Sequence, residues 1–190
     1  MERDDWNRRW QERGCHCEDD PIGVAGEEID ALPPGRALDL GCGAGRAAVW
    51  LASRGWRVTA VDFSEAALEL GRATGADVDW VLADVREYDP EPGAFDLVLV
   101  LYIHLPMNEL DDVLARARTA LATGGTLVVA GHDVANLGTG APGPTDPNLL
   151  YTAEGLAEKL AGLDIRRAER VTRPTHGTEA VDTFVVAGRR

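Results

Sequence analysis

The chain has 190 residues, a length that suits one folded domain with a buried core. Hydrophobic residues make up 45% and charged residues 27%, as in ordinary globular proteins. The net charge of −13 would repel phosphate backbones and anionic membranes, so neither nucleic acid nor a membrane is an expected partner.

The sequence shows no segment that would place the protein in or across a membrane. Its apolar runs all fall short of the roughly 20 residues that a membrane-spanning helix needs. The first ten residues, MERDDWNRRW, are charged and show no signal peptide. Three cysteines do not make a disulfide framework. A cytoplasmic location is therefore expected.

Residues 1–35 precede the first strand, and we expect one or two helices there. From residue 36 short apolar runs alternate with helical patterns, which is typical of a parallel sheet covered by helices on both faces. The first half of the alternation predicts strands at Arg36–Leu40, Val58–Val61 and Val78–Leu82, with helices at Gly45–Arg54 and Glu65–Ala73.

The second half begins with the apolar run Phe95–Tyr102, typical of a central strand. The pattern after it predicts a helix with Asn108 as N-cap, ended by Gly124-Gly125, and then a strand at Thr126–Ala130. Gly131–Asn148 has no periodicity and is expected to form a lid or binding loop. The remaining elements are a helix at Thr152–Leu160 and an antiparallel hairpin of Ile165–Val171 and Ala180–Ala187, joined by the turn signal Pro174-Thr175-His176-Gly177.

The most informative segment is ALDLGCGAGR, residues 37–46. A strand ends at Leu40, glycines follow at 41, 43 and 45, and a helix opens at once. Glycines allow a tight turn and a close approach of the backbone to a ligand, and the helix N-terminus offers free N–H groups. A dinucleotide fingerprint needs its third glycine one position later, where this chain has Arg46. This spacing weighs against a nicotinamide or flavin cofactor.

Two acidic residues follow the ends of the next two strands. Asp62 closes the second strand, where a carboxylate can accept hydrogen bonds from ribose hydroxyls, although it could instead cap the next helix in competition with Ser64. Asp84 follows the third strand, within reach of an adenine amino group, and Phe63 could lie against the adenine ring. These positions share the edge of the sheet where open α/β folds bind ligands. Together with the loop they indicate an adenosyl cofactor.

These segments resemble a known family. ALDLGCGAGR, VTAVDFS and VLADV, in this order, resemble the class I S-adenosylmethionine-dependent methyltransferases. GRAAVWLASRGWRVTAVDFS, WNRRWQERG and LYTAEGLAEKL look most like the tellurite-resistance and thiopurine methyltransferase-like group. The resemblance covers nearly the whole chain. It departs from the family at Cys42, where Ala or Gly is frequent, and from the subgroup at Cys15-His16-Cys17.

The resemblance implies a role for each matching position. Asp39 and the loop would surround the methionine part, Asp62 would hold the ribose, and the adenine would meet Phe63, Asp84 and the Val85 backbone. Leu101 and Tyr102 would border the sulfonium, and a tryptophan of the N-terminal helix would fold over the cofactor. The implied cofactor-binding set is Trp6, Trp10, Asp39, Gly41, Cys42, Gly43, Gly45, Asp62, Phe63, Asp84, Val85, Leu101 and Tyr102.

Methyl transfer to a nucleophile needs the reacting atoms in line, and it needs a general base only if the nucleophile keeps its proton until reaction. His104 is the first candidate base by position and His132 the second; the alternative for both is a loop histidine bonded to backbone or water. Cys15-His16-Cys17 does not provide a tetrahedral ligand set, so no metal is predicted, while capture of a soft acceptor by a thiol stays open beside ordinary thiols.

The resulting prediction is a single domain at 1–190, with an N-terminal helical cap at 1–35 and a core at 36–190. The fold is α/β, a doubly wound Rossmann-like sheet of seven strands, mostly parallel with an antiparallel C-terminal strand. The function is S-adenosylmethionine-dependent methyl transfer to a small-molecule acceptor. A nicotinamide-dependent oxidoreductase and a non-catalytic adenosyl-binding protein remain as alternatives. The sequence leaves the acceptor and the oligomeric state open.

Overall fold

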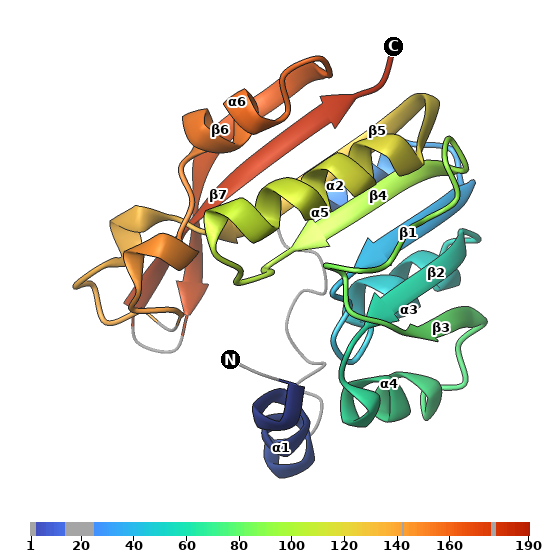
Figure 1. Ribbon diagram of the computed structural model, residues 1–190, viewed down its shortest axis with the longest axis horizontal. Coiled ribbons are helices and arrows are strands. Elements are labelled where there is room, and N and C mark those ends of the chain that lie inside the picture. Colours follow the sequence, from blue (N-terminus) through green and yellow to red (C-terminus); the bar gives the residue numbers. More distant parts are fainter. Residues whose placement is uncertain (1–2, 14–24, 142, 176–177) are drawn as a thin grey trace. The chain divides into compact units, whose positions relative to one another are not determined.

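The structure is a computed structural model, which describes residues 3–13, 25–141, 143–175 and 178–190. Met1–Asp89 and Pro90–Arg190 form two compact units. Figure 1 shows the course of the chain through both. The elements of the first unit are α1 (Arg3–Arg13), α2 (Gly26–Asp30), β1 (Arg36–Leu40), α3 (Arg46–Ser53), β2 (Arg57–Asp62), α4 (Glu65–Arg72) and β3 (Val78–Leu82). The prediction of one domain with a cap at 1–35 is not tested by this division and stays a prediction.

The first unit is a parallel sheet in which β2 lies between β1 and β3. Helices α3 and α4 pack on these strands, and α1 packs on α4. Strand β1 is buried after its first residue, and α3 packs on it. The strand bounds agree with the predicted ones to within one residue. All three strands end on the same side, so the residues that follow them gather at one edge.

The second unit begins with the central strand β4, which is buried along almost its whole length. Its elements are β4 (Phe95–Leu101), α5 (Met107–Ala120), β5 (Leu121–His132), two short 3₁₀ turns η2 (Val134–Asn136) and η3 (Pro147–Leu149), α6 (Ala153–Lys159), β6 (Asp164–Thr175) and β7 (Thr178–Gly188). Strand β4 pairs in parallel with β5, and β7 runs antiparallel to both β5 and β6. The predicted C-terminal hairpin is therefore confirmed. Figure 1 shows α5 along β4 and β5, and α6 beside β6 and β7.

Two predicted ends of the helix α5 are wrong. The helix starts at Met107 after Pro106, whose carbonyl accepts from Glu109 N, so Asn108 lies inside the first turn and is not the N-cap. The helix ends at Ala120, before Gly124-Gly125, because the chain enters β5 at once. The two glycines instead serve an irregular stretch where the pairing of β4 and β5 shifts register, and a Cβ on Gly125 would stand 3.0 Å from the Phe95 carbonyl oxygen.

The predicted loop at Gly131–Asn148 is only partly irregular. Strand β5 continues to His132, and the turns η2 and η3 follow. Asp133 and Asp146 cap these turns by accepting from backbone N–H groups two residues ahead. Short polar side chains, which defeat a periodic pattern, here build local turns. The segment is therefore more ordered than its composition suggests.

Candidate cofactor and acceptor sites

The glycine loop after β1 has the backbone conformation that its sequence predicts. Gly41, Gly43 and Gly45 all have φ between 55° and 77°, the left-handed region that side chains disfavour. The N–H groups of Gly41 and Cys42 both donate to the carbonyl of Val61, at 2.8 and 3.0 Å. These bonds tie the loop to the end of β2, and α3 begins directly after it.

Aromatic rings lie against two of these glycines. A Cβ on Gly43 would stand 2.9 Å from Cζ2 of Trp10, so the indole from α1 lies on the loop. A Cβ on Gly45 would stand 2.1 Å from Cη2 of Trp80, which comes from β3. Gly45 therefore serves the close packing of a helix start against a strand side chain.

Asp62 holds the loop from the end of β2. Its Oδ2 accepts from the N–H of Gly43 at 2.8 Å, and its Oδ1 accepts from the N–H of Ser64 at 2.9 Å. Ser64 is the N-cap of α4, because its hydroxyl accepts from Ala67 N, so the alternative that Asp62 caps this helix is excluded. Burial raises the pKa of Asp62 above its usual range, and the backbone hydrogen bonds offset part of the rise.

Asp39 is a buried carboxyl group with an unused acceptor. It lies inside β1, is 2% exposed, and its Oδ2 has no hydrogen-bond partner among the described residues. Burial, and next the nearby Asp62, raise the pKa of Asp39 to about 7. A buried oxygen without a partner costs free energy unless a donor or a cation reaches it. The α-ammonium group of an amino acid would supply both.

The raised pKa gives a testable dependence of stability on pH. The folded state holds the proton of Asp39 up to about pH 7, whereas the unfolded chain releases it near 3.8. This carboxyl group therefore lowers the free energy of unfolding as pH rises from about 4 to 7, by roughly 4 kcal/mol in all. We expect Asp39→Asn to be more stable than the wild type at about pH 8 and nearly equal at about pH 4.5. Thermal melts at both values measure the difference, and an equal effect at both would contradict the assignment.

Cys42 is a protected thiol. Burial, with the charges of Asp39 and Asp62, raises the pKa of Cys42 well above its usual range. A thiol that stays protonated is a poor nucleophile. Cys42 thus fills the loop position that Ala or Gly often takes in the family, and it adds no reactive group there.

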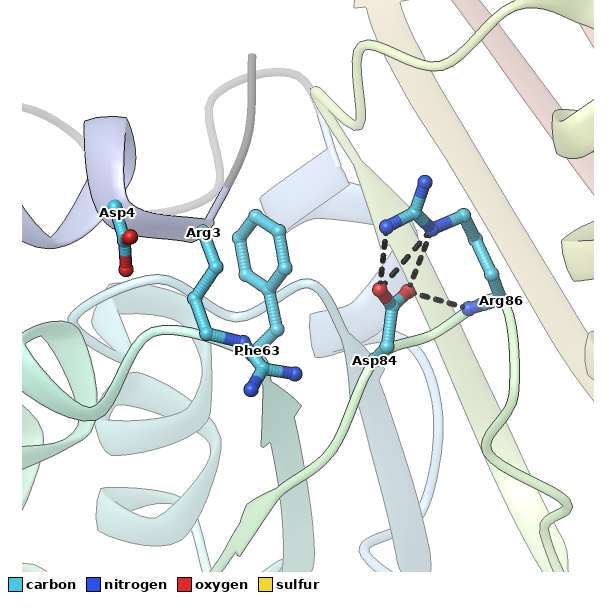
Figure 2. A pocket seen from close by; sticks show the side chains of 5 residues that line it. All are labelled: Arg3, Asp4, Phe63, Asp84 and Arg86. Carbon is cyan, nitrogen blue, oxygen red and sulfur yellow. Dashed lines mark hydrogen bonds and ion pairs between the residues drawn. The ribbon is translucent and has the colours of Figure 1, made fainter.

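Beside β2 and β3 the first unit has an open hollow of about 260 Å³, lined by Arg3, Asp4, Phe63, Asp84 and Arg86. Figure 2 shows the Phe63 ring between Arg3 and Asp84, and Arg86 folded over the carboxylate of Asp84. The guanidinium donates to both carboxylate oxygens at 2.6 to 3.0 Å and, as the main cause, lowers the pKa of Asp84. The structure thus brings the two predicted adenine contacts, Phe63 and Asp84, to one hollow. Val85 follows Asp84 and is half-buried.

An amide side chain of helix α1 hydrogen-bonds to the start of α4. Asn7 Oδ1 accepts from the hydroxyl of Ser64 at 2.6 Å and from the N–H of Ala66 at 3.4 Å. Trp6 and Trp10 stack with their ring centroids 6.5 Å apart. The sequence analysis identified both tryptophans but missed Asn7. The sequence feature that could have identified Asn7 is its position on the same predicted helix, one residue after Trp6.

A second group of polar side chains lies in the second unit, around Asp182 of β7. Tyr102 follows β4 with φ 54°, and its hydroxyl donates to Asp182 Oδ2 at 2.8 Å. His132, at the end of β5, bonds Asp182 Oδ1 through Nδ1 at 3.0 Å, and Arg173 Nε donates to Oδ2 at 2.9 Å. His104 stacks on His132 with ring centroids 5.2 Å apart. We call Tyr102, His132, Arg173 and Asp182 the Asp182 cluster.

The structure therefore brings together three residues that the sequence analysis singled out: Tyr102, His104 and His132. The alternative that His132 bonds only backbone or water is not what the structure shows, because its partner is a buried carboxylate. Leu101 ends β4 and is half-buried. Asp182 was missed, although a lone carboxylate inside the apolar run AVDTFVVA was a readable signal. Cys15-His16-Cys17 lies outside the described residues.

The chain is similar to known methyltransferases over part of its length. Residues 37–125 match the methyltransferase domain family. A trans-aconitate 2-methyltransferase from Paracidovorax citrulli is 34% identical over 134 residues, 66% of this chain and 49% of that protein. A ribosomal RNA small subunit methyltransferase C from Alcanivorax borkumensis is 33% identical over 110 residues, 50% of this chain and 31% of that protein. The chain spans about half the length of the curated relatives it matches, or less.

A solved structure matches almost the whole chain. The 1,6-didemethyltoxoflavin-N1-methyltransferase of Burkholderia thailandensis, with bound 1,6-didemethyltoxoflavin and S-adenosylhomocysteine, has a TM-score of 0.74 at 24% identity. The likeness covers 98% of this chain and 86% of that protein. It confirms the predicted fold class, a mostly parallel seven-stranded α/β sheet with an antiparallel last strand. The match of residues 37–125 to the methyltransferase domain family agrees with the predicted class, the class I S-adenosylmethionine-dependent methyltransferases, which stays a proposal. Membership of the tellurite-resistance and thiopurine group is not established by these matches.

Among the described residues, no helix is long and apolar enough to cross a membrane. The same residues hold no group of three or more metal-ligating side chains.

Proposed function

We propose that the chain transfers the methyl group of S-adenosylmethionine to a small-molecule acceptor. The observation that carries this proposal is the pair of buried carboxylates at the ends of β1 and β2. Asp62 supports the glycine loop through Gly43, and Asp39 keeps an unpartnered oxygen beside it. An adenosyl sulfonium with an α-ammonium group suits this arrangement, because it brings hydroxyls to one carboxylate and a cation to the other.

The residues of the first unit fit the parts of the cofactor one by one. Asp62 would accept from the ribose hydroxyls, and Asp39 with the loop would hold the amino acid part. The hollow beside Phe63 and Asp84 would take the adenine. Trp10, which already covers Gly43, would close over the loop, with Trp6 stacked behind it. When bound, the cofactor supplies an activated methyl group, and the chain then has mainly to align it with the acceptor.

The acceptor side of the proposal belongs to the second unit. Ligands of doubly wound folds bind beyond the carboxyl ends of the strands; Leu101 ends β4, Tyr102 follows it, and His132 ends β5. We assign the sulfonium border to Leu101 and Tyr102, and the candidate base to His132 or His104. A cytoplasmic location, membership of the tellurite-resistance and thiopurine group, and the exclusion of nucleic acid are further parts of the proposal. The net charge of −13 supports the last of these.

Calorimetry on the purified chain tests the cofactor. We expect S-adenosylmethionine and S-adenosylhomocysteine to bind with dissociation constants on the order of micromolar, near −8 kcal/mol. Reduced nicotinamide nucleotide serves as the matched control and should give no heat. Heat with the nicotinamide nucleotide alone would support the oxidoreductase alternative and end the proposal.

A coupled assay for S-adenosylhomocysteine formation tests the reaction. The panel contains hydroxyl, amine, thiol and metalloid acceptors, with a short RNA duplex beside them. We expect turnover on a small molecule and none on RNA. Cofactor binding without turnover on any acceptor would favour a non-catalytic adenosyl-binding protein.

A further inference from the structure

The Asp182 cluster has the form of a supported base. Asp182 stands opposite His132 in the register of β7 and β5, so the pairing of the strands sets the two side chains side by side. The carboxylate is 1% exposed and accepts from three side chains on three different strands or strand ends: Tyr102, His132 and Arg173. A buried carboxylate with all these partners is held in one geometry.

The ionisation of Asp182 decides which nitrogen of His132 carries the proton. Burial alone would raise the pKa of Asp182, but the hydrogen bonds from His132, Arg173 and Tyr102 outweigh it and hold the pKa below the ordinary value. An ionised carboxylate can only accept, so the proton of a neutral His132 ring lies on Nδ1. Nε2 then keeps its lone pair.

The ring of His132 is fixed on its other sides as well. His104 stacks on it at an interplanar angle of 8°, and the Tyr102 ring lies 5.2 Å away at 57°. Gly143 passes the far edge so closely that a Cβ there would stand 2.9 Å from Cδ2 and 3.2 Å from Nε2. Gly143 has no side chain, which allows its backbone to pass this close to the ring, and the His132 side chain keeps 12% of its exposure.

We propose that His132 Nε2 takes the proton of a hydroxyl acceptor, a phenol or an enol, with Asp182 as the positioning residue. This inference rests on the proposed function and names its substrate class. As the acceptor oxygen forms its bond to the methyl carbon, the carbon–sulfur bond breaks and leaves its electron pair on sulfur. The hydroxyl proton passes to Nε2 and from there to solvent, so the sulfonium charge ends as a released proton.

The choice of a hydroxyl follows from what a base is needed for. An amine that binds as the free base attacks through a lone pair it already has, and a thiol with a pKa of about 8.5 is already partly ionised near neutral pH. A phenol titrates near 10 and keeps its proton at neutral pH, so its oxygen gains most from a base in contact. Among the described residues, the charged or titratable side chains shown against the His132 ring are Asp182, Tyr102 and His104, with Arg173 reaching it through Asp182.

Comparing the rates on two phenols tests whether His132 acts as a base or has only a structural role. At about pH 8, 4-nitrophenol is largely ionised and phenol is not, so only phenol needs the base. We expect His132→Ala and Asp182→Asn to lower kcat on phenol by roughly 10²–10⁴-fold with little change in KM. On 4-nitrophenol the loss should stay below about tenfold. Added imidazole should restore part of the phenol rate of His132→Ala.

Asp133→Asn is the matched control. Asp133 is a fully buried carboxylate next to His132 in sequence, but its partners are Thr183, Arg170 and the Ala135 N–H. It should cost stability and leave the phenol to 4-nitrophenol ratio unchanged. Nitrogen NMR of the ring supplies a measurement without substrate: the wild type should show the proton on Nδ1, and Asp182→Asn should lose this preference.

The outcomes distinguish a failure of the hydroxyl inference from a failure of the proposed function. Absence of S-adenosylhomocysteine binding overturns the proposed function itself. Binding with turnover only on amines, thiols or metalloids, or on no acceptor, overturns the hydroxyl inference and leaves cofactor binding intact. Equal losses on both phenols, or a ring proton on Nε2 in the wild type, also overturn it.

Discussion

Asp62→Ala is expected to weaken the binding of S-adenosylhomocysteine by about 100-fold or more. The variant loses the acceptors for the ribose hydroxyls, and hydrogen bonds to a charged group contribute roughly 1.5–3 kcal/mol each. It also leaves the N–H groups of Gly43 and Ser64 without their partner, so the glycine loop loses its support from β2. Calorimetry with the product cofactor measures the effect directly.

Asp79→Ala is the control for this experiment. Asp79 is an exposed carboxylate on β3, so its removal changes the net charge equally without touching the loop. The affinity of Asp79→Ala for S-adenosylhomocysteine should match that of the wild type. If Asp62→Ala binds the product cofactor as tightly as the control does, the ribose assignment is wrong.

Gly45→Ala is expected to lower the melting temperature by roughly 10 °C. The new Cβ would stand 2.1 Å from Trp80 Cη2, at a φ of 77° where an alanine is strained in any case. Trp80 also lies against Gly71, where a Cβ would stand 2.5 Å from Cη2, so the same end of the indole is held between two glycines. Overpacking and backbone strain together cost about 3–4 kcal/mol, and each kcal/mol shifts the melting temperature of a chain this long by about 2–4 °C.

Gly75→Ala separates the two causes. Gly75 has a φ of 72°, but nothing stands within 4 Å of a Cβ there. This variant should show the backbone strain alone, about 1–2 kcal/mol. The double variant Gly45→Ala with Trp80→Leu should regain part of the loss that the contact causes, less the free energy lost with the indole. Melting curves that coincide for Gly45→Ala and Gly75→Ala would show that the indole contact carries no energy.

Local signals predicted most of the first unit. β1 and β3 match their predicted bounds, because their bounds depend on short apolar runs and turn residues. The predicted ends of α5 were wrong because they, too, rested on local signals alone. Gly124-Gly125 is a helix stop when only neighbours in sequence are considered, whereas the chain uses it where β5 shifts register against β4. Pairing between strands, which no local pattern contains, overrides a helix-stop preference.

Some features of the candidate site could be predicted from local sequence, and others could not. Asp39, Asp62 and the loop glycines could be identified from the sequence, since all lie at or near the end of a strand and the glycine conformations are a local need. Arg86 and Asp84 are only two residues apart in the sequence, so their pairing was also a local feature. That the Arg86 guanidinium bonds both carboxylate oxygens of Asp84 is seen only in the structure.

The sequence by itself determined the order of strands and helices, the left-handed glycine loop and the carboxylates at the strand ends, because these follow from short-range chemistry. Only the tertiary structure decided that Trp80 occupies the space beside Gly45 and that Asp182 supports His132. The latter two lie 50 residues apart and meet because β7 returns antiparallel beside β5. Such a contact depends on strand register, which is set by the burial of whole strands rather than by any residue near it in the chain.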